Sequence, residues 1–328
     1  MRKNHLMSIY QDMKEAGTTS DFPFLLGNVA YKRLLKSFRG VTTKWDQYSL
    51  ISDVNDFKTN DRIILGEAPD LLEVVESAPF ENGAMPKDDR YQIQASTKGR
   101  LWVLSRQAVI NDDLNGFLTW ADKYGRAANR TISKKVIQLI ESNGLTYDGS
   151  ALFAAAHSNT VAGDLTADDA GITKLDSAFA KFRNQTDPRS GEKITVEPWA
   201  LLVPPSKEMT AMRLTQMGDL RPISTSGGPT YNPFAGKLQV IVEPLLTITS
   251  RCYLIAKPSD LHAVEVAFLQ GKREPDLLLK RAETVRLMGG GEDPYGFEFD
   301  DMLWKVRHDW GAALGYYQGI VAIGGGAT

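Results

Sequence analysis

The stretch NDDLNGFLTWADKYGRAANRTISKKVIQLIES, residues 111–142, decides the fold. Its apolar residues recur at three- and four-residue steps, as on one face of an α-helix. They are Leu114, Phe117, Leu118, Ala121, Tyr124, Ala128, Ile132, Val136, Leu139 and Ile140. Asn111 is a suitable N-terminal cap, and Asn143-Gly144 is typical of a helix end. At 1.5 Å per residue such a helix is about 45 Å long. We therefore expect a spine that lies across a body of protein.

The segment before this helix, residues 55–107, predicts a long β-hairpin. Apolar and small residues alternate with polar ones in its second half, at Tyr91, Ile93, Ala95, Leu101, Val103 and Ser105. The tip, PFENGAMP at 79–86, carries an Asn-Gly turn flanked by prolines. Because an isolated two-stranded ribbon is marginal in water, it needs cover from the rest of the chain or from a second copy.

Residues 1–54 form the N-terminal part of the chain. The first 40 residues carry seven basic and three acidic side chains, a balance of 7 − 3 = +4. Their apolar residues are scattered, apart from FPFLL at 22–26. This pattern predicts an extended arm with little core of its own, or a disordered terminus.

The part that follows the spine predicts a mixed α and β structure. A shorter helix is expected from Thr173, with Asp176 at the third position of a capping box. A buried strand is expected at 199–203, and two more strands are expected at 237–243 and 252–256. Alternating patterns near 264–268 and 304–306, and an apolar run at 319–323, predict a β-rich end. The fold class is therefore α+β.

Composition and motifs exclude several classes of function. The 328 residues carry 38 basic and 40 acidic side chains, so the net charge is −2, whereas dedicated duplex-binding proteins usually carry a basic excess. One cysteine, Cys252, permits neither an internal disulfide nor a cysteine-based zinc site. No stretch is apolar enough for a membrane span. His157 lacks a partner at metal-ligand spacing, and no phosphate loop or nucleophile motif occurs. We predict no catalytic, cofactor-binding or metal residues.

Five phrases, in order along the chain, resemble the tailed-bacteriophage major capsid proteins of the Hong Kong 97 type. They are similar above all to the Mu-like major head subunit group. The phrases are YDGSALFAAAHSN (147–159), ALLVPPS (200–206), NPFAGKL (232–238), VEVAFL (264–269) and WKVRHDWG (304–311).

The resemblance implies a division of the chain into named parts. These are an N-terminal arm (1–54), an extended E-loop (55–107), a P-domain part (108–195) with the spine helix (111–142), an A-domain (196–258), P-domain strands (259–310), and an A-domain return with the C-terminal tail (311–328). It also implies assembly into an icosahedral shell of hexamers and pentamers that holds packaged double-stranded DNA.

Partners and contact residues follow from the same resemblance. The E-loop tip is expected to contact a neighbouring copy through Phe80, Glu81, Asn82, Gly83 and Met85. The arm is expected either to face DNA weakly through Arg2, Lys3, Lys14, Lys32 and Arg33, or to form only a solvated surface. Since only about 110 residues precede the spine, a separate scaffold protein and little or no proteolytic removal are expected. Portal and decoration proteins are further implied partners.

The implied location is the virion, after assembly in the cytoplasm of a bacterial host, with no membrane contact. Two other functions stay open at the level of sequence. One is an encapsulin-like nanocompartment shell, which uses the same fold to enclose enzymes. The other is a soluble α/β enzyme with a β-rich appendage, which would be a stable monomer with a polar pocket.

Overall fold

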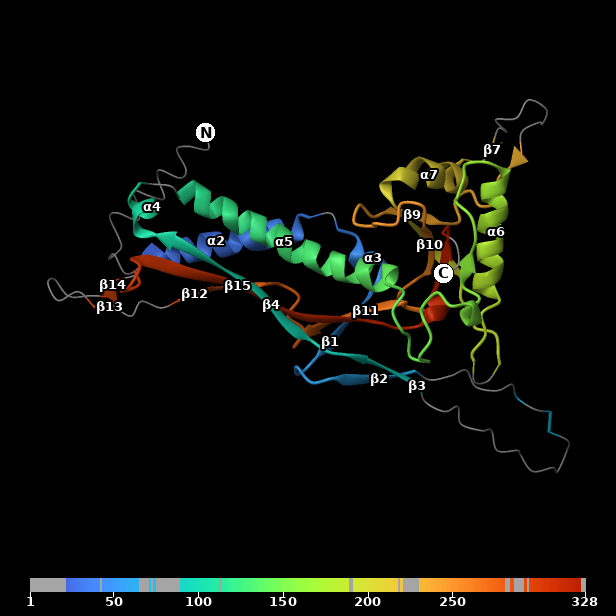
Figure 1. Ribbon diagram of the computed structural model, residues 1–328, viewed down its shortest axis with the longest axis horizontal. Coiled ribbons are helices and arrows are strands. Elements are labelled where there is room, and N and C mark those ends of the chain that lie inside the picture. Colours follow the sequence, from blue (N-terminus) through green and yellow to red (C-terminus); the bar gives the residue numbers. More distant parts are fainter. Residues whose placement is uncertain are drawn as a thin grey trace. The chain divides into compact units, whose positions relative to one another are not determined.

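The computed structural model describes residues 22–41, 43–64, 71, 73–74, 89–111, 114–188, 191–217, 219–220, 230–280, 284–285, 292–293 and 295–325. The described residues fall into two compact units. The first unit takes its described residues from 22–41, 96–131 and 272–310, and the second takes the others. Two long elements have residues in both units: helix α5 (Leu114–Glu141) and strand β15 (Asp301–Leu314) (Figure 1).

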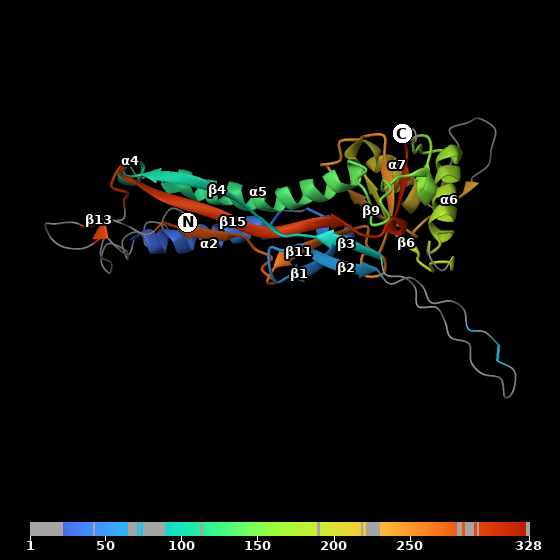
Figure 2. The same cartoon turned by 60° about the horizontal axis from the view of Figure 1, so that its bottom comes forward.

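The first unit is a small sheet with two helices on one face. Strand β4 (Ser96–Ser105) runs antiparallel to β15, with Trp102 opposite Trp304, and β12 (Asp276–Leu279) pairs with the same part of β15. Helices α2 (Phe22–Arg39) and α5 contribute apolar side chains to one core together with β4 and β15 (Figure 2). The spine therefore packs on a sheet, as the long apolar stripe predicted.

Helix α2 corrects the prediction of an extended, coreless arm. Leu26, Ala30 and Leu34 recur every four residues and are buried against the sheet. Two glycines permit close packing: a Cβ on Gly27 would lie 3.2 Å from the Trp304 ring, and one on Gly125 would lie 2.3 Å from the Leu34 carbonyl oxygen. The sequence pattern was missed because a narrow apolar stripe alternates with basic side chains. Residues 1–21 lie outside the described part of the chain.

The second unit is built around a five-stranded sheet. Its strand order is β5 (Thr160–Val161), β16 (Ile320–Ile323), β10 (Cys252–Ala256), β6 (Pro198–Val203) and β9 (Gln239–Val242). Every residue of β10 and of β16 is buried, which explains their continuous apolar sequences. The strands predicted after the spine are thus confirmed.

Two helices complete the core of this sheet. Helix α6 (Asp169–Arg183) contributes Phe179 and Phe182, and α7 (Glu208–Gln216) contributes Ala211 and Leu214. The predicted A-domain begins at residue 196. Helix α6 lies before that boundary in the sequence, but it shares a core with strands that follow the boundary. The assignment of these segments to P- and A-domains stays a prediction.

A parallel pair of strands and a two-stranded ribbon also belong to the second unit. Strand β1 (Leu50–Val54) runs parallel to β11 (Val264–Leu269). Strand β2 (Asn60–Ile64) runs antiparallel to β3 (Asp89–Ile93), and these two make up the ribbon. Ile93 and Ala95 are buried with Val54 and Ala267. The predicted alternation at positions 91, 93 and 95 is therefore confirmed.

The hairpin predicted over 55–107 is shorter than expected. Its second half divides after β3, because β4 pairs with β15 and not with β2. The side chains of β4 also have the opposite orientation to the one that the alternating sequence pattern suggested. Trp102 and Leu104 are buried, whereas Leu101 is 64% exposed and Val103 is 55% exposed. The two tryptophans that meet across β4 and β15 supply the larger buried area, which fixes the inner face.

Helix boundaries differ from the expected ones by a few residues. The spine begins at Leu114 after a short helix α4 (Arg106–Ile110), and it ends as predicted, with Asn143 at a left-handed φ of 51°. Helix α6 begins at Asp169, because Asp168 caps it by accepting a hydrogen bond from the Gly171 amide. The predicted start at Thr173 was therefore wrong by about one turn.

The remaining elements are short. They are helix α3 (Trp45–Tyr48), the 3₁₀ turns η1 (Ala155–His157), η2 (Pro205–Lys207) and η3 (Tyr317–Gly319), and the strand pairs β7 (Asp219–Leu220) with β8 (Thr230–Tyr231) and β13 (Thr284–Val285) with β14 (Glu292–Asp293).

Two glycines of α5 provide a matched test of the packing between α2 and α5. Gly125→Ala places a methyl group against the α2 backbone, so we expect a loss of about 1–3 kcal/mol in the free energy of unfolding. Gly116→Ala, where nothing lies within 4 Å, should instead stabilise the helix by up to about 1 kcal/mol. Denaturant unfolding of the full-length chain measures both. Equal effects at the two positions would show that α2 does not pack closely on α5.

Candidate functional site

A buried carboxylate lies at the root of the ribbon. Glu265 of β11 is 1% exposed. Arg62 of β2 donates to its Oε1 from Nε at 3.0 Å, and the hydroxyls of Ser52 in β1 and Tyr91 in β3 donate to its two oxygens. Four strands thus send one polar side chain each to a single point, which we call the Glu265 root.

The local sequence explains why these side chains meet. Arg62 and Tyr91 are directly opposite in the antiparallel register of the ribbon, so both project from the same face. The Tyr91 hydroxyl uses its one proton on Glu265 and therefore accepts from the Nε2–H of His262 at 2.8 Å. The root holds its carboxylate fully hydrogen-bonded, which is the arrangement that permits a charge to be buried.

Electrostatics agree with this assignment of protons. Burial and the hydrogen bond to Glu265 raise the pKa of Tyr91 far above its usual range, so the hydroxyl keeps its proton. Burial lowers the pKa of His262, so the ring is neutral and carries its proton on Nε2. The root therefore acts as a fixed anchor for the ribbon, in which Arg62 and Glu265 carry opposite charges.

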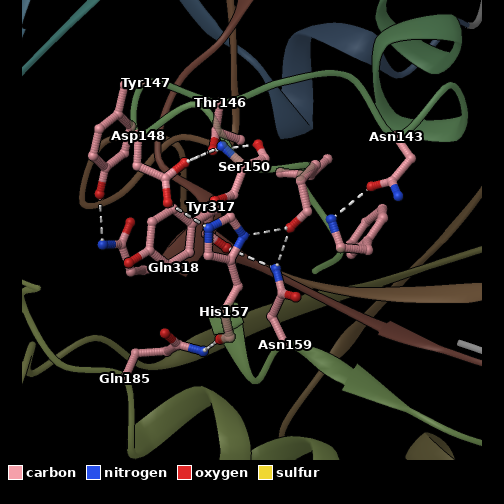
Figure 3. A network of polar contacts seen from close by, with 12 residues as sticks. Asn143, Thr146, Tyr147, Asp148, Ser150, His157, Asn159, Gln185, Tyr317 and Gln318 are labelled. Carbon is pink, nitrogen blue, oxygen red and sulfur yellow. Dashed lines mark hydrogen bonds and ion pairs between the residues drawn. The ribbon is translucent and has the colours of Figure 1, made fainter. Parts of the chain in front are cut away.

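A second polar network surrounds His157 (Figure 3). The ring is buried and stacks on Tyr317 with 3.7 Å between centroids. Its Nδ1 lies 3.0 Å from the Leu152 carbonyl oxygen, and its Nε2 lies 2.8 Å from Asp148 Oδ2. The His157 carbonyl accepts from Gln185. The network joins the loop after the spine to α6 and to η3.

Both ring nitrogens of His157 face acceptors, a carbonyl and a carboxylate. Both nitrogens are therefore occupied by contacts within the network. The network consequently has a structural role.

Asp148 completes the network from its edge. Partial burial raises the pKa of Asp148, but hydrogen bonds from Thr146, His157 and the Ser150 amide outweigh that effect and lower it to about 2. The carboxylate is therefore charged at all ordinary pH values.

The predicted site residues have three different outcomes. The tip residues Phe80, Glu81, Asn82, Gly83 and Met85 lie outside the described part of the chain, as do Arg2, Lys3 and Lys14. Lys32 and Arg33 are exposed on α2, and Arg33 lies 4.0 Å from Asp122 of α5. The Glu265 root was missed, because Glu265 sits between Val264 and Val266 and its strand was expected to have one face in water.

Other chemistry finds no support among the described residues. Burial raises the pKa of the Cys252 thiol to about 12, so this cysteine is inert. No group of three metal-ligating side chains is placed to share an ion there. Within the same residues, no helix has the length and hydropathy of a transmembrane segment.

Removing the charge at the root tests its role as an anchor. Glu265→Gln keeps the size of the side chain but leaves Arg62 without its ionic partner, so we expect a loss of about 1–3 kcal/mol in unfolding free energy. The control is Glu197→Gln, whose pair with Arg183 is exposed and should cost less than about 1 kcal/mol. Hydrogen exchange at 60–64 and 89–93 locates the effect. Unchanged exchange in the ribbon would contradict the anchor.

The lowered pKa of Asp148 predicts a dependence of stability on pH. Because the folded-state pKa lies below that of an unfolded aspartate, the stabilisation is complete above about pH 4 to 5 and is lost as pH falls toward 2. The difference in unfolding free energy between the wild type and Asp148→Asn should therefore shrink over that interval. Denaturant unfolding at a series of pH values measures it. A difference that stays constant down to pH 2 would contradict the hydrogen-bond network.

The chain matches the sequence model of the family described as "Phage capsid protein" over residues 90–323. This match includes β4, the spine, parts of both units and the strand β11 that carries Glu265. Among curated protein sequences, none is significantly similar to the chain.

Solved phage structures share the fold at low sequence identity. A chain from Microbacterium phage Oxtober96 is 11% identical with a TM-score of 0.52, covering 84% of this chain and 89% of that one. One from Mycobacterium phage Adephagia is 12% identical with a TM-score of 0.52, covering 90% of each. One from the procapsid of bacteriophage JBD30 is 15% identical with a TM-score of 0.50, covering 95% and 77%. The fold is therefore the Hong Kong 97 type, and the chain belongs to the phage capsid protein family.

Proposed function

We propose that this protein is a major capsid protein whose copies assemble into an icosahedral head of hexamers and pentamers around packaged double-stranded DNA. The observation that carries this proposal is the family match over 90–323. The absence of a metal-ligand group or a reactive thiol among the described residues is compatible with a non-enzymatic role.

The ribbon supports self-association. In the described residues it is a sheet of only two strands, anchored at one end by the Glu265 root. Ile63 on its outer side is 62% exposed, and Phe57 beside it is 46% exposed. Because a two-stranded ribbon cannot bury enough surface alone, a neighbouring copy is the natural cover. We assign the contact to the tip residues 80–85.

Finer parts of the proposal concern partners and kinship. A separate scaffold protein, a portal and decoration proteins would act with the shell, and the finished protein would reside in the virion after assembly in the host cytoplasm. The five phrases quoted above support a kinship with the Mu-like head subunits. The family match favours a phage head over an encapsulin-like compartment.

Microscopy of the purified full-length chain tests the proposal. We expect closed shells by negative stain for the wild type. Deletion of residues 81–85 should leave a folded chain, by circular dichroism, that forms few or no shells, because the tip contact is lost. A wild type that stays monomeric under all assembly conditions would refute the capsid function. Normal shells from the deletion variant would refute only the role of the tip.

A further inference from the structure

Basic charge is concentrated on the two helices of the first unit. Helix α2 carries four basic side chains and no acidic one. The part of α5 up to residue 131 carries three basic side chains and one acidic one. Together the balance is 7 − 1 = +6, whereas the whole chain has a net charge of −2. The average over the chain therefore hides a strongly positive region.

The two helices lie side by side and direct most of these charges outward. Ser37 of α2 donates to Asp122 of α5 at 2.8 Å, and Asn129 donates to the Phe38 carbonyl at 2.9 Å. Gly125 lies against the α2 backbone. The outward side chains define what we call the basic helix face: Lys32, Arg33, Lys36, Lys123, Arg126 and Arg130, all exposed.

Little within the chain neutralises this face. Its one acid, Asp122, is already bonded to Ser37 and lies near Arg33. The fourth cation of α2, Arg39, is paired with Glu274 and is not counted in the face. Lys32, Lys36 and Arg126 have no acidic side chain within ion-pair distance in the described part of the chain. Six cations with one acid among them create a field that attracts an extended polyanion.

The layout of the charges indicates what kind of polyanion fits. Lys123, Arg126 and Arg130 follow one another at three- and four-residue steps, so they form a row about 10 Å long at 1.5 Å per residue. A second row on α2 runs beside it. Cations repeated in two rows suit the evenly spaced phosphates of a nucleic-acid backbone, which are bound without regard to base sequence.

We propose that the basic helix face binds the phosphate backbone of duplex DNA. The inference rests on the proposed function, since it places this face on the side of the shell that meets the packaged genome. It extends the contact from the arm to the spine helix. Binding is electrostatic, and each cation replaces a condensed counterion on the DNA.

An acidic segment of a second copy is the competing occupant. Residues 65–88 contain six acidic side chains and one basic one, a balance of −5. Apolar residues, among them Leu71, Leu72, Val74 and Val75, are interspersed with these acids. Among the described residues the two helices expose few large apolar side chains, Leu25 at 38% and Trp120 at 52% with Lys123 over its ring, so such a segment would leave most of its apolar residues uncovered. Phosphate carries charge alone, and DNA is therefore the better fit.

Matched triple variants test the proposal. The test variant is Lys32→Gln, Lys36→Gln and Arg126→Gln. The control is Lys58→Gln, Arg213→Gln and Lys257→Gln, which removes the same number of exposed lysines and arginines from the second unit. The affinity of the full-length chain for duplex DNA of mixed sequence is measured by fluorescence anisotropy at several salt concentrations, below the protein concentration at which shells form. Negative-stain microscopy follows assembly in parallel.

We expect the test variant to bind DNA at least about tenfold more weakly at low salt. Its slope of log affinity against log salt should fall by about 3, while the control keeps both values and both variants still form shells. Equal effects of the two triples, or none, would overturn the proposal. A second result would also overturn it: a peptide of residues 65–88 displaces the DNA, and only the test variant loses its shells. That result would assign the basic helix face to a contact with a neighbouring copy. If the wild type forms no shells, the capsid function is refuted. The anisotropy measurement would still show whether the basic helix face binds DNA.

Discussion

The ribbon depends on one ion pair, in which the partly exposed guanidinium of Arg62 meets the buried carboxylate of Glu265. The ribbon shares only a small apolar core with β1 and β11, in which Ile93 packs with Val54 and Ala267, so polar contacts at its root also fix its direction. Arg62 and Tyr91 bring one hydrogen bond from each strand of the ribbon to the same carboxylate. The carboxylate of Glu265 can remain charged while it is buried only because every one of these hydrogen-bond donors is present. The direction of the ribbon and the burial of the charge therefore depend on each other.

The first unit uses charge in the opposite way. Its interior is apolar and aromatic, with Trp102 stacked on Tyr124 at 4.7 Å and Trp304 packed on Phe117. Many of its basic side chains lie on the outer side of the two helices, and others pair with acids of the sheet, such as Arg307 with Asp276. Charges that hold the fold are thus buried and paired, whereas those on the helices are exposed and largely unpaired. Exposed charges contribute little to stability, so those of the basic helix face are available for a partner.

Much of the fold could be predicted from the sequence. The spine was found because its apolar stripe continues over many turns, and β6, β10 and β16 were found because their apolar runs are continuous. Helix α2 was missed because Leu26, Ala30 and Leu34 form a stripe only one residue wide between basic side chains. The inner face of β4 was misassigned because Leu101 and Val103 alternate as well as Trp102 and Leu104 do. The candidate site was harder still: the tip was proposed from turn residues, while the Glu265 root gave no local signal.

The local pattern of apolar residues was enough to give the type and approximate length of most of the long elements. The periodicity of apolar residues is a local property, because it depends only on residues that are close together in the sequence. Only the tertiary structure decided which strands pair and which charges meet, since Arg62 and Glu265 are 203 positions apart. The same pattern of apolar residues would permit other partners for β4 and another direction for the ribbon. Close packing and the requirement to pair a buried charge select one of them.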